Sequence, residues 1–226
     1  MTVRDLLTAL PDVPTLRDRC RALAALEAVM DPVYGHFSYA PAWSDREQVA
    51  LMDNGSGDDY AIVFSDAGAY ARGFAHESVM SPYADEDEAP WPGLVDAVPE
   101  AFRPYVTEPA FCDDLGAGPV PRATVVFWRE AGDTAWHTGP VEMPTDRARG
   151  FADGADFLFD VLAAGTPEAY RDFAADYYER PVDLDAVRHV FALRPLSGAV
   201  ALALNPAAVA ERALEAARTT GYPVAS

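Results

Sequence analysis

The stretch NGSGDDYAIVFSDAGAYARGFAHE, residues 54–77, decides the fold that the sequence predicts. Aromatic and β-branched residues at 60–64 are typical of a strand. The SDAG segment that follows is typical of a turn, because Asp can bond its own backbone and Gly accepts a positive φ. Upstream, Asn54-Gly55 between two extended segments is a strong hairpin signal. We therefore predict an antiparallel meander of three strands: residues 47–52, 60–64 and 69–76.

The last strand of this meander has two different faces, because side chains alternate across a strand. One face carries only small residues: Ala69, Ala71, Gly73 and Ala75. We expect the Ala-rich helix that begins after Thr15 to pack closely on it. The opposite face carries large or polar residues: Tyr70, Arg72, Phe74 and His76. That face is either covered by other parts of the chain or a working surface.

Strand patterns dominate the chain before residue 140, and helical patterns dominate it after residue 153. A second hairpin is predicted at 123–138, with Trp128 facing Trp136 across it, and residues 107–122 are predicted to be a loop. The tail after Gly221 is expected to fray. This order predicts an α+β fold with an antiparallel sheet rather than alternating βαβ units. We divide the chain near residue 150, with the sheet and an N-terminal helix in 1–150 and a helical region, packed on the same core, in 151–226.

Charge limits the classes of partner. The 226 residues include 36 acidic and 17 basic side chains, all of the latter Arg, for a net charge of −19. This balance argues against nucleic acids and anionic membranes, which attract positive charge. It allows a basic protein partner, because opposite charge speeds association, although the alternative is that the charge only keeps the protein soluble. The N-terminus lacks a signal peptide and no apolar run reaches ~18 residues, so we expect a cytoplasmic protein.

Catalytic signatures are absent from the sequence. It contains no Gly-x-Ser-x-Gly elbow, no phosphate-binding loop, no His-Glu-x-x-His and no paired Cys-x-x-Cys. The NGSGDD segment is typical of a hairpin turn, since its spacing does not match a calcium loop. We therefore assign no catalytic residue, no metal and no cofactor. The alternative is that His76, His137 and Asp58 or Asp59 meet in space as an acid/base or metal cluster.

A polar loop at 78–90 contains the densest acidic run of the chain: Asp85, Glu86, Asp87 and Glu88. Like charges repel and extend a segment, so we expect this loop to be exposed. It is either a plain solvated surface or the rim of a binding surface that steers a partner.

The central stretch resembles the central motif of the SUKH superfamily of immunity proteins. The matching residues are Gly55, Gly57, Asp58, Tyr60, Gly68, His76 and Glu77. The Leu-Pro-x-x-Tyr helix at that family's start is missing here, and the helical C-terminal third is additional. The resemblance implies an α+β domain that binds and neutralises a protein toxin, or a related intracellular binding module.

We therefore expect a non-catalytic, acidic, immunity-like binding protein that neutralises or sequesters a protein partner. The predicted binding residues are Asp58, Asp59, Tyr70, Arg72, Phe74, His76, Glu77, Asp85, Glu86, Asp87 and Glu88. The alternative is a small-molecule enzyme or sensor with an aromatic pocket and a His/carboxylate site. A deep pocket with converging titratable groups favours the enzyme, and a flat acidic surface favours the binder.

Overall fold

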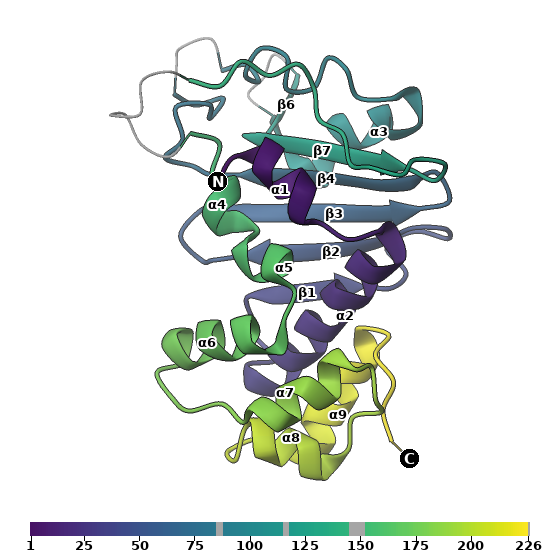
Figure 1. Cartoon of the computed structure of the whole chain (residues 1–226), viewed down its shortest axis with the longest axis vertical. Coiled ribbons are helices and arrows are strands. Elements are labelled where there is room, and N and C mark those ends of the chain that lie inside the picture. Colours follow the sequence, from purple (N-terminus) through teal and green to yellow (C-terminus); the bar gives the residue numbers. More distant parts are fainter. Residues whose placement is uncertain (85–87, 115–117, 145–151, 226) are drawn as a thin grey trace. The chain divides into compact units, whose positions relative to one another are not determined.

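The computed structural model describes residues 1–84, 88–114, 118–144 and 152–225 (Figure 1). The chain forms two compact units, each assembled from two separate stretches. Unit 1 comprises Met1–Val13 and Met52–Asp160, and unit 2 comprises Pro14–Leu51 and Val161–Ser226. This division differs from the predicted one near residue 150, because the first long helix and the first strand belong with the C-terminal helices.

The fold class is α+β with an antiparallel five-stranded sheet, as the sequence predicted. The strand order is β1-β2-β3-β4-β7, so the predicted meander is present as β2-β3-β4. The strands are β1 (Phe37–Ala40), β2 (Gln48–Asp53), β3 (Asp59–Ser65), β4 (Gly68–Phe74) and β7 (Val125–Glu130). A separate small hairpin pairs β5 (Cys112–Asp114) with β6 (Pro119–Pro121), where the sequence predicted a loop.

The described helices form two groups, and the longest of them belong to the second group, in unit 2. The first group is α1 (Val3–Ala9), α3 (Arg103–Val106) and α4 (Ala155–Leu158), with 3-10 turns η1 (Glu100–Phe102) and η2 (Pro109–Phe111). The second group is α2 (Val13–Met30), α5 (Asp160–Ala164), α6 (Pro167–Tyr177), α7 (Leu184–Phe191), α8 (Gly198–Leu204) and α9 (Ala210–Thr219). In the described parts of the chain, none of these helices combines the length and the apolarity needed to cross a bilayer.

The small face of β4 receives a close neighbour, as predicted, but a different one. A Cβ atom at Gly73 would lie 2.9 Å from the Phe159 ring and 3.0 Å from Leu158. Phe159 is itself fixed, since it stacks on Tyr60 at 4.8 Å and meets Phe127 edge-on at 5.3 Å. At Gly73 the close approach is thus made by the end of α4 and the residue after it, and not by α2. Figure 1 shows α1 and α4 side by side over β4 and β7.

The opposite face of β4 is covered by other parts of unit 1. Tyr70 meets Phe102 and Tyr105, with ring centres 6.3 and 5.6 Å apart. The Arg72 guanidinium lies 5.1 Å from the centre of the Phe111 ring. Large aromatic side chains bury much area, so these contacts make the face a second apolar core.

The second predicted hairpin is reduced to one bridge. Residues 134–138 do not form a strand; only His137 pairs with Trp128, through two backbone hydrogen bonds of 2.8 and 2.9 Å. Trp136 packs edge-on against Phe127 at 5.6 Å and donates its Nε1–H to Pro11 O at 2.6 Å. The expected Trp128–Trp136 pair was therefore wrong, because Trp136 has both an apolar contact and a hydrogen-bond acceptor elsewhere.

Unit 2 is built around α2, which is buried along its C-terminal half. The prediction that this helix begins after Thr15 was wrong, because α2 begins at Val13 and Pro14 occupies its first turn, where a missing N–H is tolerated. The predicted fraying after Gly221 was also wrong. Tyr222 is buried and donates to Val190 O, and Val224 forms a parallel bridge with Leu196.

Candidate functional site

The residues predicted for binding do not form one accessible surface. Tyr70, Arg72 and Phe74 are buried in unit 1, so a partner in solution does not reach them. Asp85, Glu86 and Asp87 lie outside the described residues. Glu88 is exposed and has a φ of +46°.

Asp58 and His76 are brought together, as one alternative anticipated. The Asp58 Oδ1 atom lies 2.7 Å from His76 Nδ1 and accepts the His76 backbone N–H at 2.9 Å. Asp58 Oδ2 accepts Asn54 Nδ2–H at 2.7 Å. Burial tends to raise the pKa of Asp58, but these hydrogen bonds outweigh it, and the pKa is lowered from its ordinary value. The imidazole is 42% exposed, and its Nε2 atom lies 3.9 Å from Glu77.

Asp59 belongs to a different cluster, because adjacent strand residues point to opposite faces. Its Oδ1 atom accepts a hydrogen bond from Arg72, and its Oδ2 atom lies 3.6 Å from Arg122 Nη2. Burial raises the pKa of Asp59, although the guanidiniums of Arg72 and Arg122 act to lower it. Burial also lowers the pKa of Arg72. An ion pair placed this deep in unit 1 holds β3 to β4 and is not a contact surface.

His137 does not join His76. The His137 Nε2 atom lies 3.3 Å from Asp133 Oδ2, and its backbone pairs with Trp128, which is opposite Tyr70. His76 is six positions further along the chain than Tyr70, which is about 20 Å at the rise of an extended strand. Among the residues that the structure describes, no three His, Cys, Asp or Glu side chains are arranged to hold a metal.

Unit 2 has an exposed aromatic and acidic surface that the sequence reasoning missed. Val33 and Tyr34, between α2 and β1, are 73% and 80% exposed, and Tyr177, at the end of α6, is 45% exposed. The two segments adjoin, because the His36 ring contacts the Tyr177 ring at 5.3 Å. We call this the Tyr34 surface, and it comprises Asp31, Val33, Tyr34, Asp176, Tyr177 and Glu179.

A buried carboxylate fixes the frame of the Tyr34 surface. Glu27 is 1% exposed and accepts hydrogen bonds from Tyr170 Oη at 2.7 Å, Tyr178 Oη at 2.8 Å and His36 N at 2.5 Å. It therefore ties α2, the loop before β1 and α6 to one another. Burial raises the pKa of Glu27, and the hydrogen bonds offset this only in part.

The conformation of the loop in the Tyr34 surface is fixed by hydrogen bonds to its backbone and by a glycine. Asp31 Oδ1 accepts the backbone N–H groups of Val33 and Tyr34, both at 3.0 Å. A Cβ atom on Gly35 would lie 2.8 Å from the carbonyl oxygen of Asp31, so a larger residue does not fit there. A signal for this loop was present in the sequence: Pro32 and Gly35 bracket two large side chains, where a connection is ordinarily polar.

Comparisons of this chain with family models, curated proteins and solved structures found no match.

Proposed function

We propose that this protein is a non-catalytic binding protein that sequesters a basic protein partner through the Tyr34 surface. The observation that carries the proposal is the exposure of Val33, Tyr34 and Tyr177 on a frame fixed by Glu27. Tyrosine is enriched among the residues that dominate interface energetics, since it combines apolar area with a polar tip. A frame that is already ordered lowers the entropic cost of binding.

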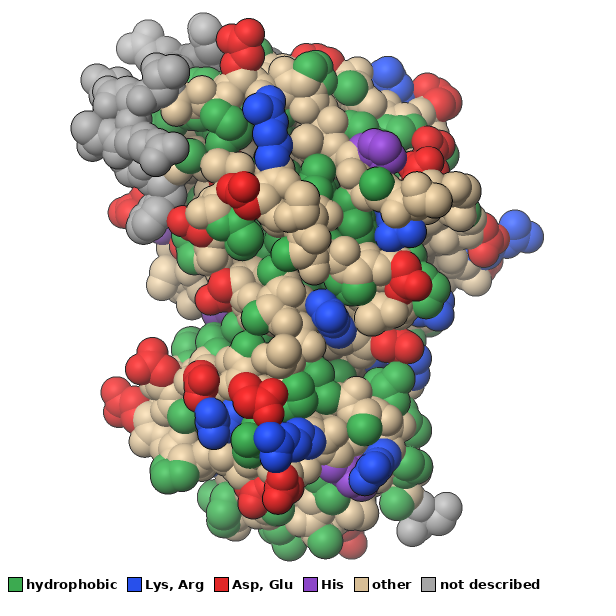
Figure 2. All heavy atoms as spheres, viewed as in Figure 1, with side chains coloured by type: hydrophobic (Ala, Val, Ile, Leu, Met, Phe, Trp, Pro, Cys, Tyr) green, Lys and Arg blue, Asp and Glu red, His purple; other side chains and the backbone are tan. Residues whose placement is uncertain are grey.

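Charge indicates the class of partner. Asp31, Asp176 and Glu179 accompany the exposed Tyr side chains, and the whole chain has a net charge of −19. Figure 2 shows Asp and Glu side chains distributed over the visible face of the molecule. Such a field attracts a basic protein and repels a second copy of the same chain. The resemblance of the central motif to SUKH immunity proteins supports a partner of the toxin type.

The test is capture followed by measurement of binding. Wild-type protein and the double variant Tyr34→Ser/Tyr177→Ser are used as bait in a lysate of the source cell. Any protein enriched by wild type is identified, purified and measured for binding kinetics. Leu202→Ser is the matched control, because Leu202 is an exposed apolar residue of α8 in the same unit.

We expect a basic protein whose affinity for the double variant is reduced at least about tenfold, mainly through faster dissociation, as is usual for changes at one interface. The Leu202→Ser control should bind as wild type does. An identified partner that is acidic, or that binds the double variant with unchanged kinetics, would contradict the proposal.

A second candidate, a small-molecule enzyme or sensor, is favoured by one observation. The Asp58–His76 pair orients an imidazole whose Nδ1 atom faces a carboxylate and whose ring is partly exposed, which is the arrangement of a general base with its orienting acid. In this case a metabolite should raise the melting temperature of the wild type by mass action. His76→Gln should abolish that shift, while the Tyr34 surface variants should leave it unchanged.

A further inference from the structure

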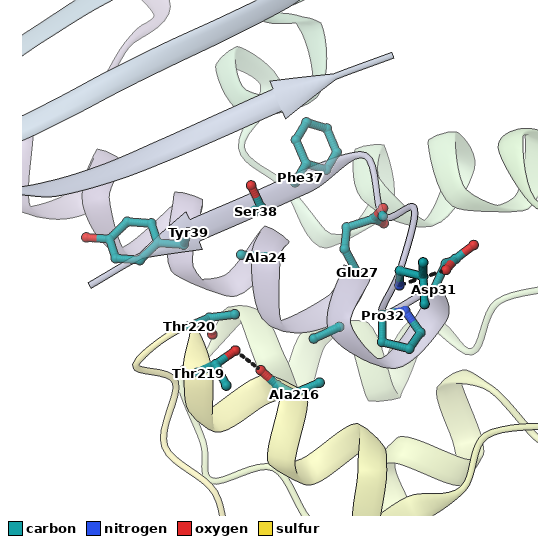
Figure 3. Close-up of a pocket in the computed structure, with 13 residues that line it drawn as sticks. Ala24, Glu27, Asp31, Pro32, Phe37, Ser38, Tyr39, Ala216, Thr219 and Thr220 are labelled. Carbon is teal, nitrogen blue, oxygen red and sulfur yellow. Dashed lines mark hydrogen bonds between the residues drawn. The ribbon is translucent and has the colours of Figure 1, made fainter. Parts of the chain in front are cut away.

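A cavity of about 200 Å³ opens beside the loop of the Tyr34 surface, within unit 2 (Figure 3). It lies between α2, β1 and α9. Figure 3 shows Glu27, Asp31 and Pro32 at one end and Tyr39, Thr219 and Thr220 at the other. Val33 belongs both to its lining and to the Tyr34 surface, so the cavity and the surface are continuous.

The charge of this cavity has one sign. Two acidic side chains line it: Glu27 is in the last turn of α2, and Asp31 directly follows the helix and donates its backbone N–H to Glu27 O at 2.8 Å. No Arg is among the lining residues that the structure describes, and the chain has no Lys. A cavity with this lining favours a cationic group over a neutral or anionic one.

The carboxylates differ in what they can still bind. Glu27 already accepts hydrogen bonds from two Tyr hydroxyls and a backbone N–H, so its oxygens are occupied. Asp31 Oδ1 accepts two backbone N–H groups, while Asp31 Oδ2 has no donor among the described residues. Asp31 Oδ2 is therefore the acceptor open to a ligand.

The remaining wall of the cavity can pack against an aliphatic part of a ligand and can accept hydrogen bonds from it. Ala24, Ala28 and Ala216 provide small apolar side chains. The hydroxyl of Thr219 donates to Ala216 O at 2.7 Å, and that of Thr220 donates to Ala217 O at 2.8 Å. Each hydroxyl oxygen has lone pairs left to accept from a ligand.

We propose that this cavity receives an arginine side chain of the partner, an inference that rests on the function proposed above. A methylene stem packs on the alanines while its charged head reaches Asp31. A guanidinium suits the site better than an ammonium, since its five N–H donors lie in one plane and it is more weakly hydrated. It can bond Asp31 Oδ2 and a hydroxyl at once, whereas the ammonium binds as a point charge.

The first test uses the full chain with a probe and no partner. Acetyl-arginine methylamide, and the neutral acetyl-citrulline methylamide of similar shape, are titrated into isotope-labelled protein and followed by amide NMR shifts. We expect the arginine probe to shift Ala28, Thr219 and Thr220 at millimolar concentration, and the citrulline probe to leave them unchanged. Equal shifts with both probes, or none with the arginine probe, would overturn the inference.

Asp31→Asn is the informative variant, because Asn keeps one side-chain oxygen to accept from Val33 and Tyr34 and replaces Oδ2 with an NH2 group, which removes both the charge and the acceptor open to the ligand. It should weaken binding of the arginine probe by about tenfold, as expected for loss of a charge-assisted bond. Glu211→Gln is the matched control, an exposed acid of α9 that does not line the cavity, and it should have no effect. Unchanged probe affinity in Asp31→Asn would contradict the assignment of Asp31.

The partner assay separates the two proposals. Ala216→Leu fills the cavity and leaves Tyr34 and Tyr177 in place. It should therefore lower the affinity for the partner if an arginine of the partner enters the cavity. Partner binding that depends on Tyr34 but is insensitive to Ala216→Leu and Asp31→Asn would overturn the arginine site and leave the proposed function standing. Arginine-probe binding in a protein whose Tyr34 surface variants do not affect any partner would overturn the proposed function.

Discussion

Glu27 is the residue whose substitution reports most directly on unit 2. Glu27→Gln has one side-chain oxygen where three donors now converge, so at least one buried donor loses its partner. We expect a loss of about 1–3 kcal/mol in unfolding free energy, the usual cost of an unsatisfied buried group. Urea denaturation at neutral pH measures this loss, and Glu211→Gln on the exposed surface should cost almost nothing.

The effect of pH on Glu27→Gln has a definite sign. Burial raises the pKa of Glu27 in the folded state above its ordinary 4.5, so the folded state holds the proton more tightly than the unfolded state does. The stabilising contribution of Glu27 is thus largest below pH 4.5 and declines as the pH rises through the raised folded pKa. The difference in unfolding free energy between wild type and Glu27→Gln should therefore become smaller as the pH rises from 4.5 through the folded pKa. A gap that widens would contradict the raised pKa.

Gly73 gives a second prediction at this scale. A Cβ atom there meets Leu158 and Phe159, and Phe159 is held between Tyr60 and Phe127. Overpacking costs about 1–3 kcal/mol, which exceeds the gain of about 0.4–1 kcal/mol from restricting the unfolded chain. Gly73→Ala should therefore lower the denaturation midpoint.

Gly132→Ala is the matched control for Gly73, because no heavy atom lies within 4 Å of the added Cβ at Gly132. It should leave the midpoint unchanged or slightly raised. Equal shifts of the denaturation midpoint in the two variants would show that the β4 face can accommodate a Cβ atom at Gly73.

At the scale of elements, α7 depends on a local cap. Asp183 precedes the helix and accepts the Ala186 N–H at 2.8 Å. Asp183→Ala removes an acceptor from the helix start and should cost about 1 kcal/mol. Asp185→Ala, two residues later and 91% exposed, is the control. A thermal melt in which both variants match wild type would show that tertiary packing alone holds α7.

The elements predicted correctly are those with local signals. The residues Ser65-Asp66-Ala67-Gly68 favour the β3–β4 turn, and Gly68 has the required positive φ of +130°. Asn54-Gly55 likewise predicted the β2–β3 connection, and Gly55 has a φ of +71°. In both cases the deciding residues lie within a few positions of one another, so the sequence alone specifies the element.

The elements predicted wrongly depend on distant contacts. The C-terminal tail is ordered by a bridge from Val224 to Leu196 and by the burial of Tyr222. Residues 134–138 do not extend as a strand, and Trp136 bonds to Pro11, 125 positions away. Periodicity in a short window contains no information on such partners.

The Tyr34 surface was missed for the same reason. Tyr170 and Tyr178 are 143 and 151 positions from Glu27, and their hydrogen bonds settle where the loop before β1 lies. The central motif was predicted correctly as a hairpin, but Tyr70, Arg72 and Phe74 are covered by side chains from irregular segments: Tyr83, Phe102, Tyr105 and Phe111. Sequence alternation assigned these residues to one face without revealing what covers it.

At the scale of the whole molecule, charge should govern encounter with the partner. With a net charge of −19, the association rate with a basic protein should fall steeply as salt rises. Asp176→Asn/Glu179→Gln should lower the association rate and flatten its salt dependence, with little change in dissociation, because rim charges steer without being buried. Stopped-flow kinetics over a salt series, with Glu211→Gln as control, measures both rates. A double variant that acts only on dissociation would contradict this steering role.

The interleaving of the two units has a consequence for biosynthesis. The chain passes from unit 1 to unit 2 after Val13, back after Leu51, and to unit 2 again after Asp160. α2 and β1 are translated before unit 1 is completed, whereas the helices that complete their own unit, α6 to α9, are translated after Asp160. At roughly 5–20 residues per second, the remaining stretch takes on the order of 10–35 s to emerge from the ribosome. During that interval the apolar side of α2 lacks its native cover, so we expect the nascent chain to bind chaperones that shield such surfaces.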